Sequence, residues 1–298
     1  MKTLLVIPCY NHSKYLPDLL KKIRKYYNDD ILIIDDGSSC SIKIKQSNLD
    51  IIRNDINKGK GFSIIKAAKY AIDNKYSHII TLDSDMQHDP SHLNTIIENF
   101  QSSRVNIIQM KKKYENHEGF IKSFFSKIFY TIFEKFTDIN IEKGSSDFYL
   151  ITKKVRDQII NSNISFIFLR GFIHWSGFSK LYITYVPNKR IHGKSKYGFI
   201  KQLEFALTGV YFYESKFFVY LLLISLFLFF TALIYIFYII YSFYFAGSIE
   251  QTGWSTLVII LLFFGSFIIL LNSFVIFIIM KIFNFVSNKP NFIIDDEK

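Results

Sequence analysis

The sequence predicts an α/β domain built on a mainly parallel sheet with helices on both faces, followed by a hairpin of two transmembrane helices. Two observations lead to this fold class. Short apolar runs rich in β-branched residues alternate with segments of helical periodicity in the N-terminal part of the chain, which is the pattern of a parallel sheet with crossover helices. Residues 217–280 contain no Lys, Arg or Asp, and their apolar runs are too long and too uniformly apolar for core helices of a soluble domain.

The expected strands and helices alternate along residues 3–110. Strands are expected at the apolar runs 3–7, 31–34, 51–52, 79–82 and 105–110. Helices are expected where apolar residues recur at helical spacing, at 16–27, 61–74 and 90–100. Pro90 fits the first turn of the last of these helices. In such an alternation, the loops that follow the strands gather along one edge of the sheet.

Two further segments have the pattern of helices that touch a membrane surface. Residues 119–136 carry Phe and Ile at helical spacing on one face, and Lys, Ser and Thr on the other. Such a helix suits the membrane interface, and an ordinary core-facing helix fits the pattern equally well. Residues 197–216, directly before the first long apolar run, are expected to form a second interfacial helix.

The apolar runs 217–246 and 254–280 each exceed the ~20 residues that cross a bilayer core as a helix. The connection between them is too short to be a domain, so the two spans form a hairpin whose ends share one side. Lysines flank the hairpin, whereas the connection has no Lys or Arg, and the positive-inside rule therefore places both termini in the cytoplasm. The expected organisation is a cytoplasmic domain, a juxtamembrane segment, the hairpin and a cytoplasmic tail, at residues 1–196, 197–216, 217–282 and 283–298.

The chain carries a net charge of +11, and residues 1–216, which contain nearly all of the charged residues, have a balance of +12. A positive balance fits attraction to anionic lipid headgroups and phosphorylated substrates. Nucleic acid is the competing partner, and it ranks lower because a membrane-anchored chain already faces an anionic surface. The two cysteines, Cys9 and Cys40, have no metal-binding spacing and are expected to be reduced.

Two carboxylates, Asp83 and Asp85, directly follow the expected strand 79–82. Alternate residues of an extended chain share a side, so these two acids point the same way and Gln87 has the same parity. Carboxylate and carbonyl oxygens are the ligands that Mg²⁺ and Mn²⁺ prefer. The pattern indicates a divalent metal site, with a plain polar turn as the alternative for so short a motif.

Three more polar motifs follow or connect the expected strands. They are Pro8-Cys9-Tyr10-Asn11-His12, Asp35-Asp36-Gly37-Ser38 and Asn57-Lys58-Gly59-Lys60-Gly61. At a sheet edge, carboxylates can accept hydrogen bonds from a base or ribose, and the N–H groups of a helix N-terminus can face a diphosphate. Taken singly, each motif is an ordinary turn or solvated surface, and the third lacks the spacing of a P-loop.

Together and in this order, the four motifs resemble those of glycosyltransferase family two, whose fold is called GT-A. More narrowly, the chain resembles polyprenyl-phosphate glycosyltransferases, relatives of dolichyl-phosphate mannose synthase, of the bacterial type with two transmembrane helices. Three later segments extend the resemblance: residues 144–150 (Gly-Ser-Ser-Asp-Phe-Tyr-Leu), Leu169-Arg170-Gly171 with Trp175-Ser176-Gly177-Phe178, and residues 190–197 (Arg-Ile-His-Gly-Lys-Ser-Lys-Tyr).

The resemblance implies inverting transfer of a sugar from a UDP- or GDP-sugar to a polyprenyl phosphate, undecaprenyl phosphate in a bacterial-type chain. Asp85 is implied to bind Mg²⁺ or Mn²⁺, with Asp83 and Gln87 completing the site. Asp147 is implied to act at the sugar or acceptor, as the third catalytic acid beside Asp83 and Asp85. The residues implied to bind the nucleotide-sugar are Pro8, Tyr10, Asn11, His12, Asp35, Asp36, Lys60, Asp83 and Ser84. Those implied to bind the acceptor or a phosphate are Arg170, Arg190, Ser195 and Lys196.

One residue departs from the family pattern. His12 stands where family members commonly carry Glu, so base recognition and the local pKa are expected to differ. Three rival functions remain: a processive polysaccharide synthase, a transferase with a non-polyprenyl acceptor, and a non-catalytic nucleotide-sugar-binding membrane protein. The first would usually add a Gln-x-x-Arg-Trp motif, which this chain lacks. The sequence identifies neither the sugar nor the lipid, and the resemblance makes a homo-oligomer plausible.

Overall fold

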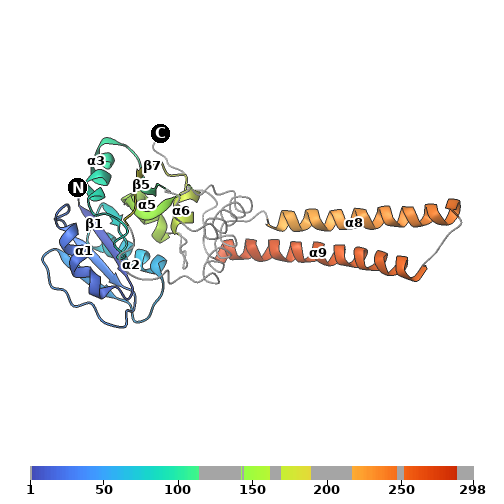
Figure 1. The fold of residues 1–298 in the computed structure, drawn as a ribbon, viewed down its shortest axis with the longest axis horizontal. Helices are drawn as coiled ribbons and strands as arrows, with labels where there is room; N and C mark the ends of the chain where they lie inside the picture. The colour runs from blue at the N-terminus through green and yellow to red at the C-terminus, as the bar shows by residue number, and fades with distance from the viewer. Residues whose placement is uncertain are drawn as a thin grey trace. The chain divides into compact units, whose positions relative to one another are not determined.

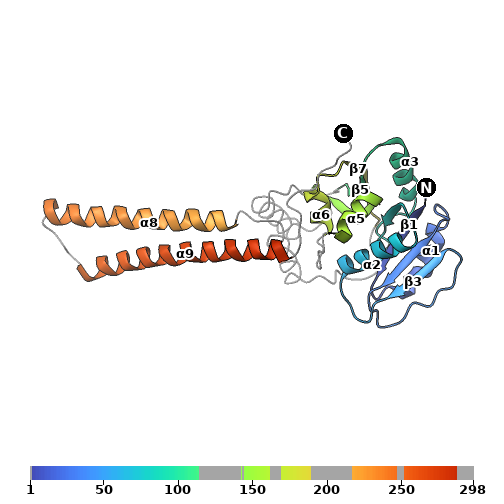
Figure 2. The ribbon, with the colours of Figure 1, turned by 180° about the vertical axis from the view of Figure 1, so that it is seen from behind.

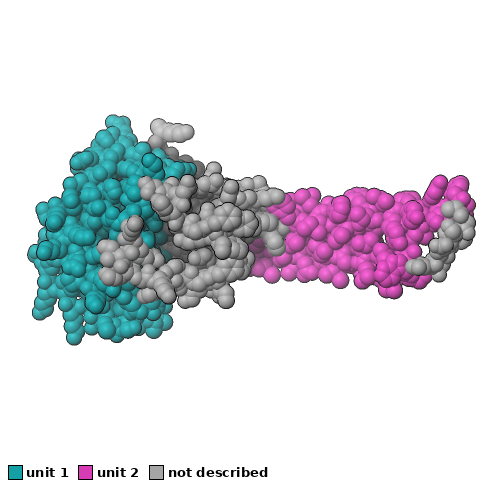
Figure 3. All heavy atoms as spheres, viewed as in Figure 1, with its two compact units in different colours: residues 1–131, 139–209, 287–298 teal, residues 132–138, 210–286 magenta. Residues whose placement is uncertain are grey.

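The computed structural model describes residues 2–113, 142, 144–161, 169–188, 217–246 and 252–286. These residues fall into two compact units, one formed by the described residues up to 188 and one by the two long C-terminal helices (Figure 3). The expected interfacial segments 119–136 and 197–216, and the tail after residue 286, lie outside the described residues.

The first unit is built on a seven-stranded sheet with the order β3-β2-β1-β4-β6-β5-β7. Its strands are β1 (Thr3–Cys9), β2 (Ile31–Asp35), β3 (Leu49–Arg53), β4 (His78–Thr81), β5 (Ile107–Lys112), β6 (Ser145–Thr152) and β7 (Lys180–Tyr185). Strands β1 to β4 run parallel, as do β5 and β7, whereas β6 runs antiparallel to both β4 and β5. The predicted mainly parallel sheet is confirmed, with one antiparallel strand inside it.

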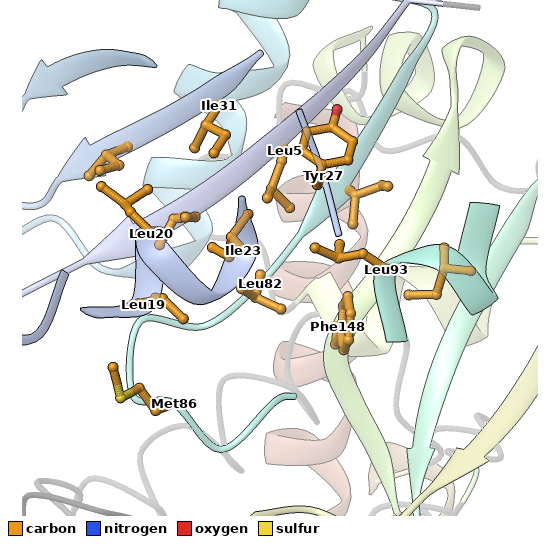
Figure 4. Packing of buried hydrophobic residues seen from close by; sticks show 14 of the residues in the cluster. Leu5, Leu19, Leu20, Ile23, Tyr27, Ile31, Leu82, Met86, Leu93 and Phe148 are labelled. Carbon is orange, nitrogen blue, oxygen red and sulfur yellow. The ribbon is translucent and has the colours of Figure 1, made fainter. Parts of the chain in front are cut away.

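Helices cover both faces of the sheet, as predicted (Figures 1 and 2). On one face, α1 (Leu16–Ile23) and α3 (His92–Ser102) join a single apolar cluster with alternate residues of β1 and β2 and with residues of β5 and β6; Leu93 of α3 lies near Phe148 of β6 (Figure 4). On the other face, α2 (Lys60–Asp73) contacts β1 and β2 and buries small and apolar residues such as Ile64 and Ala68. The remaining helices of this unit are η1 (Ser13–Tyr15), α5 (Lys153–Asn161) and α6 (Leu169–Trp175).

Helix α1 ends four residues earlier than the predicted 16–27. The guanidinium of Arg24, directly after the helix, donates to the carbonyl oxygens of Asp29, Ser47 and Asn48 at 2.7, 3.0 and 2.8 Å. These bonds stabilise a turn in place of further helix, because one cation satisfies carbonyl groups from two loops. The apolar spacing up to residue 27 persists because the Tyr27 ring packs into the same core.

The second unit is a pair of helices, α8 (Phe217–Tyr241) and α9 (Thr252–Val286), with a π-helical turn at Ser242–Ala246. Both helices are long and apolar enough to cross a membrane, over Val219–Tyr241 and Gly253–Ile282. The helices pack against each other through small residues, which are buried, while many large apolar side chains are exposed. Buried serines such as Ser225 and Ser266 donate to the carbonyl oxygen three residues earlier, both at 2.8 Å, so their hydroxyl groups are satisfied within the helix.

Candidate active site

The carboxyl ends of β1, β2 and β4 meet at one edge of the sheet. Cys9 of β1 pairs with Asp35 of β2, and Thr81 of β4 pairs with Tyr149 of β6. Because β6 runs antiparallel to β4, its first residues lie at this same edge. The hydroxyl of Thr81 donates to the carbonyl oxygen of Asp147 at 2.7 Å and fixes the start of β6 there. The edge therefore collects polar loops that are far apart in the sequence.

Lys60, the first residue of α2, joins two carboxylates at this edge. Its Nζ donates to Oδ1 of Asp83 and, at 2.9 Å, to Oδ2 of Asp147. All three side chains are partly exposed, by 31%, 29% and 28%, so a ligand can reach them. Burial lowers the pKa of Lys60, but the carboxylates of Asp147 and Asp83 outweigh it, so the pKa is raised and the ammonium stays charged.

The segment after β4 is a turn rather than a continued strand. The strand ends at Thr81, one residue before the predicted end, and Met86 has a φ of 59°. Partly exposed and buried side chains nevertheless alternate along it: Asp83, Asp85 and Gln87 are partly exposed, while Ser84, Met86 and His88 are buried. The backbone N–H of Gln87 donates to Oδ1 of Asp85 at 3.1 Å, which stabilises the turn.

The oxygen atoms of this turn fit a divalent cation that shares its coordination with a substrate. Asp83 and Asp85 supply carboxylates, and Gln87 supplies an amide oxygen that accepts a hydrogen bond from Lys112 Nζ at 3.4 Å. Within the described part of the chain, no group of three or more His, Cys, Asp and Glu side chains is placed to enclose a metal. Mg²⁺ typically binds through one or two carboxylates plus substrate phosphates, and two carboxylates meet that requirement.

The loop after β1 is tied to both neighbouring loops. Nδ1 of His12 lies 3.0 Å from Oγ of Ser84, in the turn after β4. On the other side, the N–H of Asn11 donates to Oγ of Ser38 at 2.9 Å, and its Oδ1 accepts from the N–H of Ser39 at 2.8 Å. Asn11 has a φ of 56°, a left-handed conformation that Asn adopts more readily than most residues. The ring of Tyr10 is exposed beside this loop.

Asp35, the last residue of β2, is buried and paired within the protein. Its Oδ1 accepts from the N–H of Ser38 at 2.9 Å, and its Oδ2 forms a salt bridge with Arg53 at 3.0 Å. Arg53 also donates to the carbonyl oxygen of Ser38 at 2.7 Å. These bonds shape the Asp35–Ser39 turn. Pro8 lies one residue before the end of β1, within the strand rather than after it.

Asp36 connects the same turn to the start of α2. Its carboxylate accepts from Nδ2 of Asn54 at 2.8 Å and from the N–H groups of Lys58 and Gly59 at 3.0 and 2.9 Å. Asp36 is buried, so these charge-assisted bonds are shielded from water. The result is a fixed backbone directly before Lys60.

Gly37 allows these two loops to touch. Its φ is +70°, and a Cβ at this position would lie 2.5 Å from the carbonyl carbon of Ile56 and 2.7 Å from the nitrogen of Asn57. No side chain fits at that distance from backbone atoms. The glycine of the Asp-Asp-Gly-Ser motif is thus required by close backbone approach as well as by its conformation.

His88 lies beneath the carboxylate turn. Its ring stacks on Phe148 with centroids 5.2 Å apart and is 2% exposed. Among the described residues, its Nδ1 has no hydrogen-bond partner. Burial lowers the pKa of His88 to about 4, with Asp83 opposing the shift, so the imidazole is neutral at neutral pH.

The structure brings most of the predicted site residues to one edge, from five separate segments. Arg170 lies in α6, but its side chain is outside the described residues, as are Arg190, Ser195 and Lys196. The sequence reasoning missed Arg53 and Asn54, which hold the two acids after β2. A signal was present for one of them, since Arg53 directly follows the expected strand 51–52 just as Asp35 directly follows the expected strand 31–34.

A mainly parallel sheet with carboxylates and a lysine gathered at its carboxyl edge defines an α/β protein with a polar site where open α/β sheets bind ligands. The family model of Glycosyl transferase family 2 matches residues 4–162, more than half of the chain. The chain belongs to this family, as the motif order predicted, and its α/β domain has the GT-A fold.

Similar proteins include several named glycosyltransferases. The chain is 26% identical to the uncharacterized glycosyltransferase YkcC of Bacillus subtilis (strain 168), over 97% of this chain and 92% of the relative. It is 25% identical to the bactoprenol glucosyl transferase of Shigella phage SfX, over 70% of this chain and 72% of the relative.

Among solved structures, S. aureus TarS 1–349 in complex with UDP-GlcNAc is similar, with 16% identity, a TM-score of 0.44 and coverage of 71% of this chain and 66% of that chain. Glucosyl-3-phosphoglycerate synthase from Mycobacterium tuberculosis, in complex with Mn²⁺, UDP-glucose and phosphoglyceric acid, is 10% identical with a TM-score of 0.47, over 70% of this chain and 77% of that chain.

Proposed function

We propose that the protein transfers a sugar from a nucleotide-sugar to a polyprenyl phosphate, with inversion, at the cytoplasmic face of the membrane. The observation that carries the proposal is the meeting of Asp83, Asp85, Asp147 and Lys60 at the carboxyl edge of a glycosyltransferase sheet. The apolar hairpin and the similarity to a bactoprenol glucosyl transferase support a lipid acceptor.

The donor half of the site is formed by the loops after β1 and β2 and the start of α2. Tyr10, the Asn11 loop and the Asp35–Asp36 turn form the nucleoside pocket. Because Asp35 and Asp36 already hold protein N–H groups and Arg53, their main contribution is a rigid pocket wall. Lys60 and Ser84 are the proposed contacts to the diphosphate of the donor.

Asp85 and Asp83, assisted by Gln87, are the residues that would hold Mg²⁺ or Mn²⁺. Such an ion, when bound, acts as a Lewis acid that stabilises negative charge on the departing nucleoside diphosphate. The partial exposure of Asp83, Asp85 and Gln87 leaves room for phosphate oxygens in the same coordination sphere.

The acceptor requires little help from a base. A lipid phosphate is already ionised at neutral pH, so an oxygen of it attacks the anomeric carbon as the bond to the leaving diphosphate breaks, which inverts that carbon. Asp147 lies beside Lys60 and on our proposal orients the sugar or the acceptor. Arg170, Arg190, Ser195 and Lys196 are the proposed contacts to the acceptor phosphate.

The membrane supplies the acceptor. The hairpin would anchor the domain where a polyprenyl chain is confined, which raises the effective concentration of acceptor at the site. We further propose that the catalytic domain and both termini are cytoplasmic, in an integral protein of the cytoplasmic membrane. We also propose that the protein forms a homo-oligomer.

The direct test incubates detergent-purified protein with undecaprenyl phosphate, Mg²⁺ or Mn²⁺ and one UDP- or GDP-sugar at a time. Mass spectrometry of the lipid extract is expected to show a lipid-phosphate sugar from one donor. Donor consumption without a lipid product would assign a different acceptor. Nucleotide-sugar binding without any turnover would assign a non-catalytic binding protein.

A further inference from the structure

The side chain of Lys60 holds two acids that lie far apart in the sequence. Asp83 follows β4 and Asp147 lies in β6, and both accept hydrogen bonds from the same Nζ. Asp36 fixes the backbone immediately before Lys60 through the N–H groups of Lys58 and Gly59. The fixed N-terminus of α2 thus positions the Lys60 ammonium beside the two acids.

A divalent cation on Asp83 and Asp85 would meet the same Asp83 carboxylate that Lys60 holds. The ammonium and the ion would then lie side by side, and like charges at such short range repel strongly where both are partly buried. One carboxylate of Asp83 cannot serve both cations at full strength. Lys60 holds Oδ1 of Asp83, so a metal on the other oxygen would lie within one carboxylate of the ammonium, and the repulsion between the two cations favours movement of Lys60 away from Asp83.

The diphosphate of a donor offers the displaced ammonium a new partner. Lys60 lies at the N-terminus of α2, where the helix dipole favours phosphate groups and where the first-turn N–H groups after Gly59 have no partner within the helix. A diphosphate bound there would attract both the metal and the ammonium. Cation and donor would then each make the binding of the other more favourable.

We infer that Lys60 is a resident counter-ion: in the empty enzyme it neutralises Asp83 and Asp147, and it yields Asp83 when metal and nucleoside diphosphate bind together. This inference rests on the proposed function and deepens it, because it makes metal binding depend on the donor. A further consequence is weak metal binding by the empty enzyme.

The test measures Mn²⁺ binding to the full-length protein in detergent by electron paramagnetic resonance, without any donor. In the Lys60→Met variant the ammonium is absent, and Mn²⁺ affinity is expected to rise about tenfold, which corresponds to ~1.4 kcal/mol. Lys58→Met is the matched control. It removes the same charge two residues away, from a side chain that lies over the Phe62 ring rather than on the acids, and its affinity should stay within about twofold of the parent.

A second readout uses added UDP as the nucleoside diphosphate. UDP is expected to strengthen Mn²⁺ binding more in the parent protein than in Lys60→Met, because only the parent must release a lysine. Lys60→Arg keeps the charge and should bind Mn²⁺ like the parent. If Lys60→Met does not fold, Lys60→Arg takes its place in the comparison with Lys58→Met. In that case, a Mn²⁺ affinity of Lys60→Arg above that of the parent would count against the inference.

Equal Mn²⁺ affinity in Lys60→Met and Lys58→Met would overturn the counter-ion role. The proposed transferase function would survive that result if the lipid product still forms from one donor with Mn²⁺. Absence of Mn²⁺ binding in every variant, with and without UDP, would overturn both the counter-ion role and the metal site.

Discussion

Nδ1 of His12 lies 3.0 Å from Oγ of Ser84, which joins the loop after β1 to the turn that carries Asp83 and Asp85. The bond spans two strands whose carboxyl ends adjoin in the sheet. It places the residue that departs from the family pattern in contact with the carboxylate turn. A shift of His12 on nucleoside binding would therefore also shift Ser84, in the segment proposed to hold the metal.

The first prediction concerns this bond. His12→Ala and Ser84→Ala should each weaken donor binding about fivefold, because a hydrogen bond of this kind contributes ~1 kcal/mol. The double variant should be little worse than either single one, since both remove the same interaction. Donor affinity measured by isothermal titration completes this cycle. Additive losses would show that His12 and Ser84 act separately.

The second prediction distinguishes, at two glycines, the cost of backbone strain from the cost of steric overlap by an added Cβ atom. Both Gly37 and Gly59 have a positive φ, +70° and +88°, but only at Gly37 would a Cβ strike other atoms. Gly59→Ala should lower stability by ~1 kcal/mol through backbone strain alone. Gly37→Ala should lower stability clearly more than Gly59→Ala does. It should also weaken donor binding, because the Ile56–Asn57 backbone must move.

Thermal unfolding of both variants in detergent, together with UDP binding, tests this difference. Equal melting temperatures for Gly37→Ala and Gly59→Ala would mean that the two loops separate at no cost. In that case the close approach at Gly37 would have no part in shaping the nucleoside pocket.

The sheet was predictable where a strand carries its own pattern. The runs that form β1, β2 and β4 are apolar and β-branched, and their polar ends identify the site edge without any tertiary information. Strands β6 and β7 were not predicted. β6 opens with Ser-Ser-Asp, so its apolar run comes only in its second half, and β7 mixes charged and aromatic residues.

The site was predictable in its membership but not in its pairings. That Lys60 contacts both Asp83 and Asp147 follows from the insertion of antiparallel β6 beside β4, a long-range choice that no local spacing records. The partners of Asp36 were not predictable either. Its carboxylate was predicted to hold a nucleoside, and in the structure it accepts from Asn54 and from two backbone N–H groups.

The third prediction concerns metal dependence. Asp85→Ala should lower the rate of lipid glycosylation at least about a hundredfold, and EDTA should do the same to the parent, if Asp85 holds the ion that stabilises the leaving group. Asp89→Ala is the matched control, because the Asp89 carboxylate accepts from the N–H of Ser91 at 2.9 Å and from Nδ2 of Asn188 at 3.5 Å and is not one of the proposed metal ligands. Retention of metal-dependent activity in Asp85→Ala would refute the assignment.

The fourth prediction is a loss of stability in mild acid that depends on His88. Its pKa is lowered to about 4 in the folded protein from an ordinary value of 6.5, mainly by burial. Between those values the unfolded chain binds a proton that the folded chain does not, so stability falls as pH drops from 6.5 towards 4. Above pH 6.5 this contribution is fully present.

His88→Gln has no group that titrates in this range. The difference in melting temperature, parent minus variant, should therefore decrease as pH falls from 6.5 to 4. This holds whatever stability the substitution removes at neutral pH. A difference that stays constant with pH would show that His88 is protonated equally in both states.

The fifth prediction tests the orientation of the chain with its own cysteines. Cys9 is buried and Cys40 is exposed, so a membrane-impermeant maleimide should label only Cys40. If the lysine-flanked ends of the hairpin are cytoplasmic, Cys40 reacts in inside-out vesicles and not in intact spheroplasts. A Cys40→Ser variant that carries Ser248→Cys between the two helices should show the opposite pattern. Labelling of Cys40 in spheroplasts would place the catalytic domain outside, away from cytoplasmic nucleotide-sugars, and would refute the proposed function as stated.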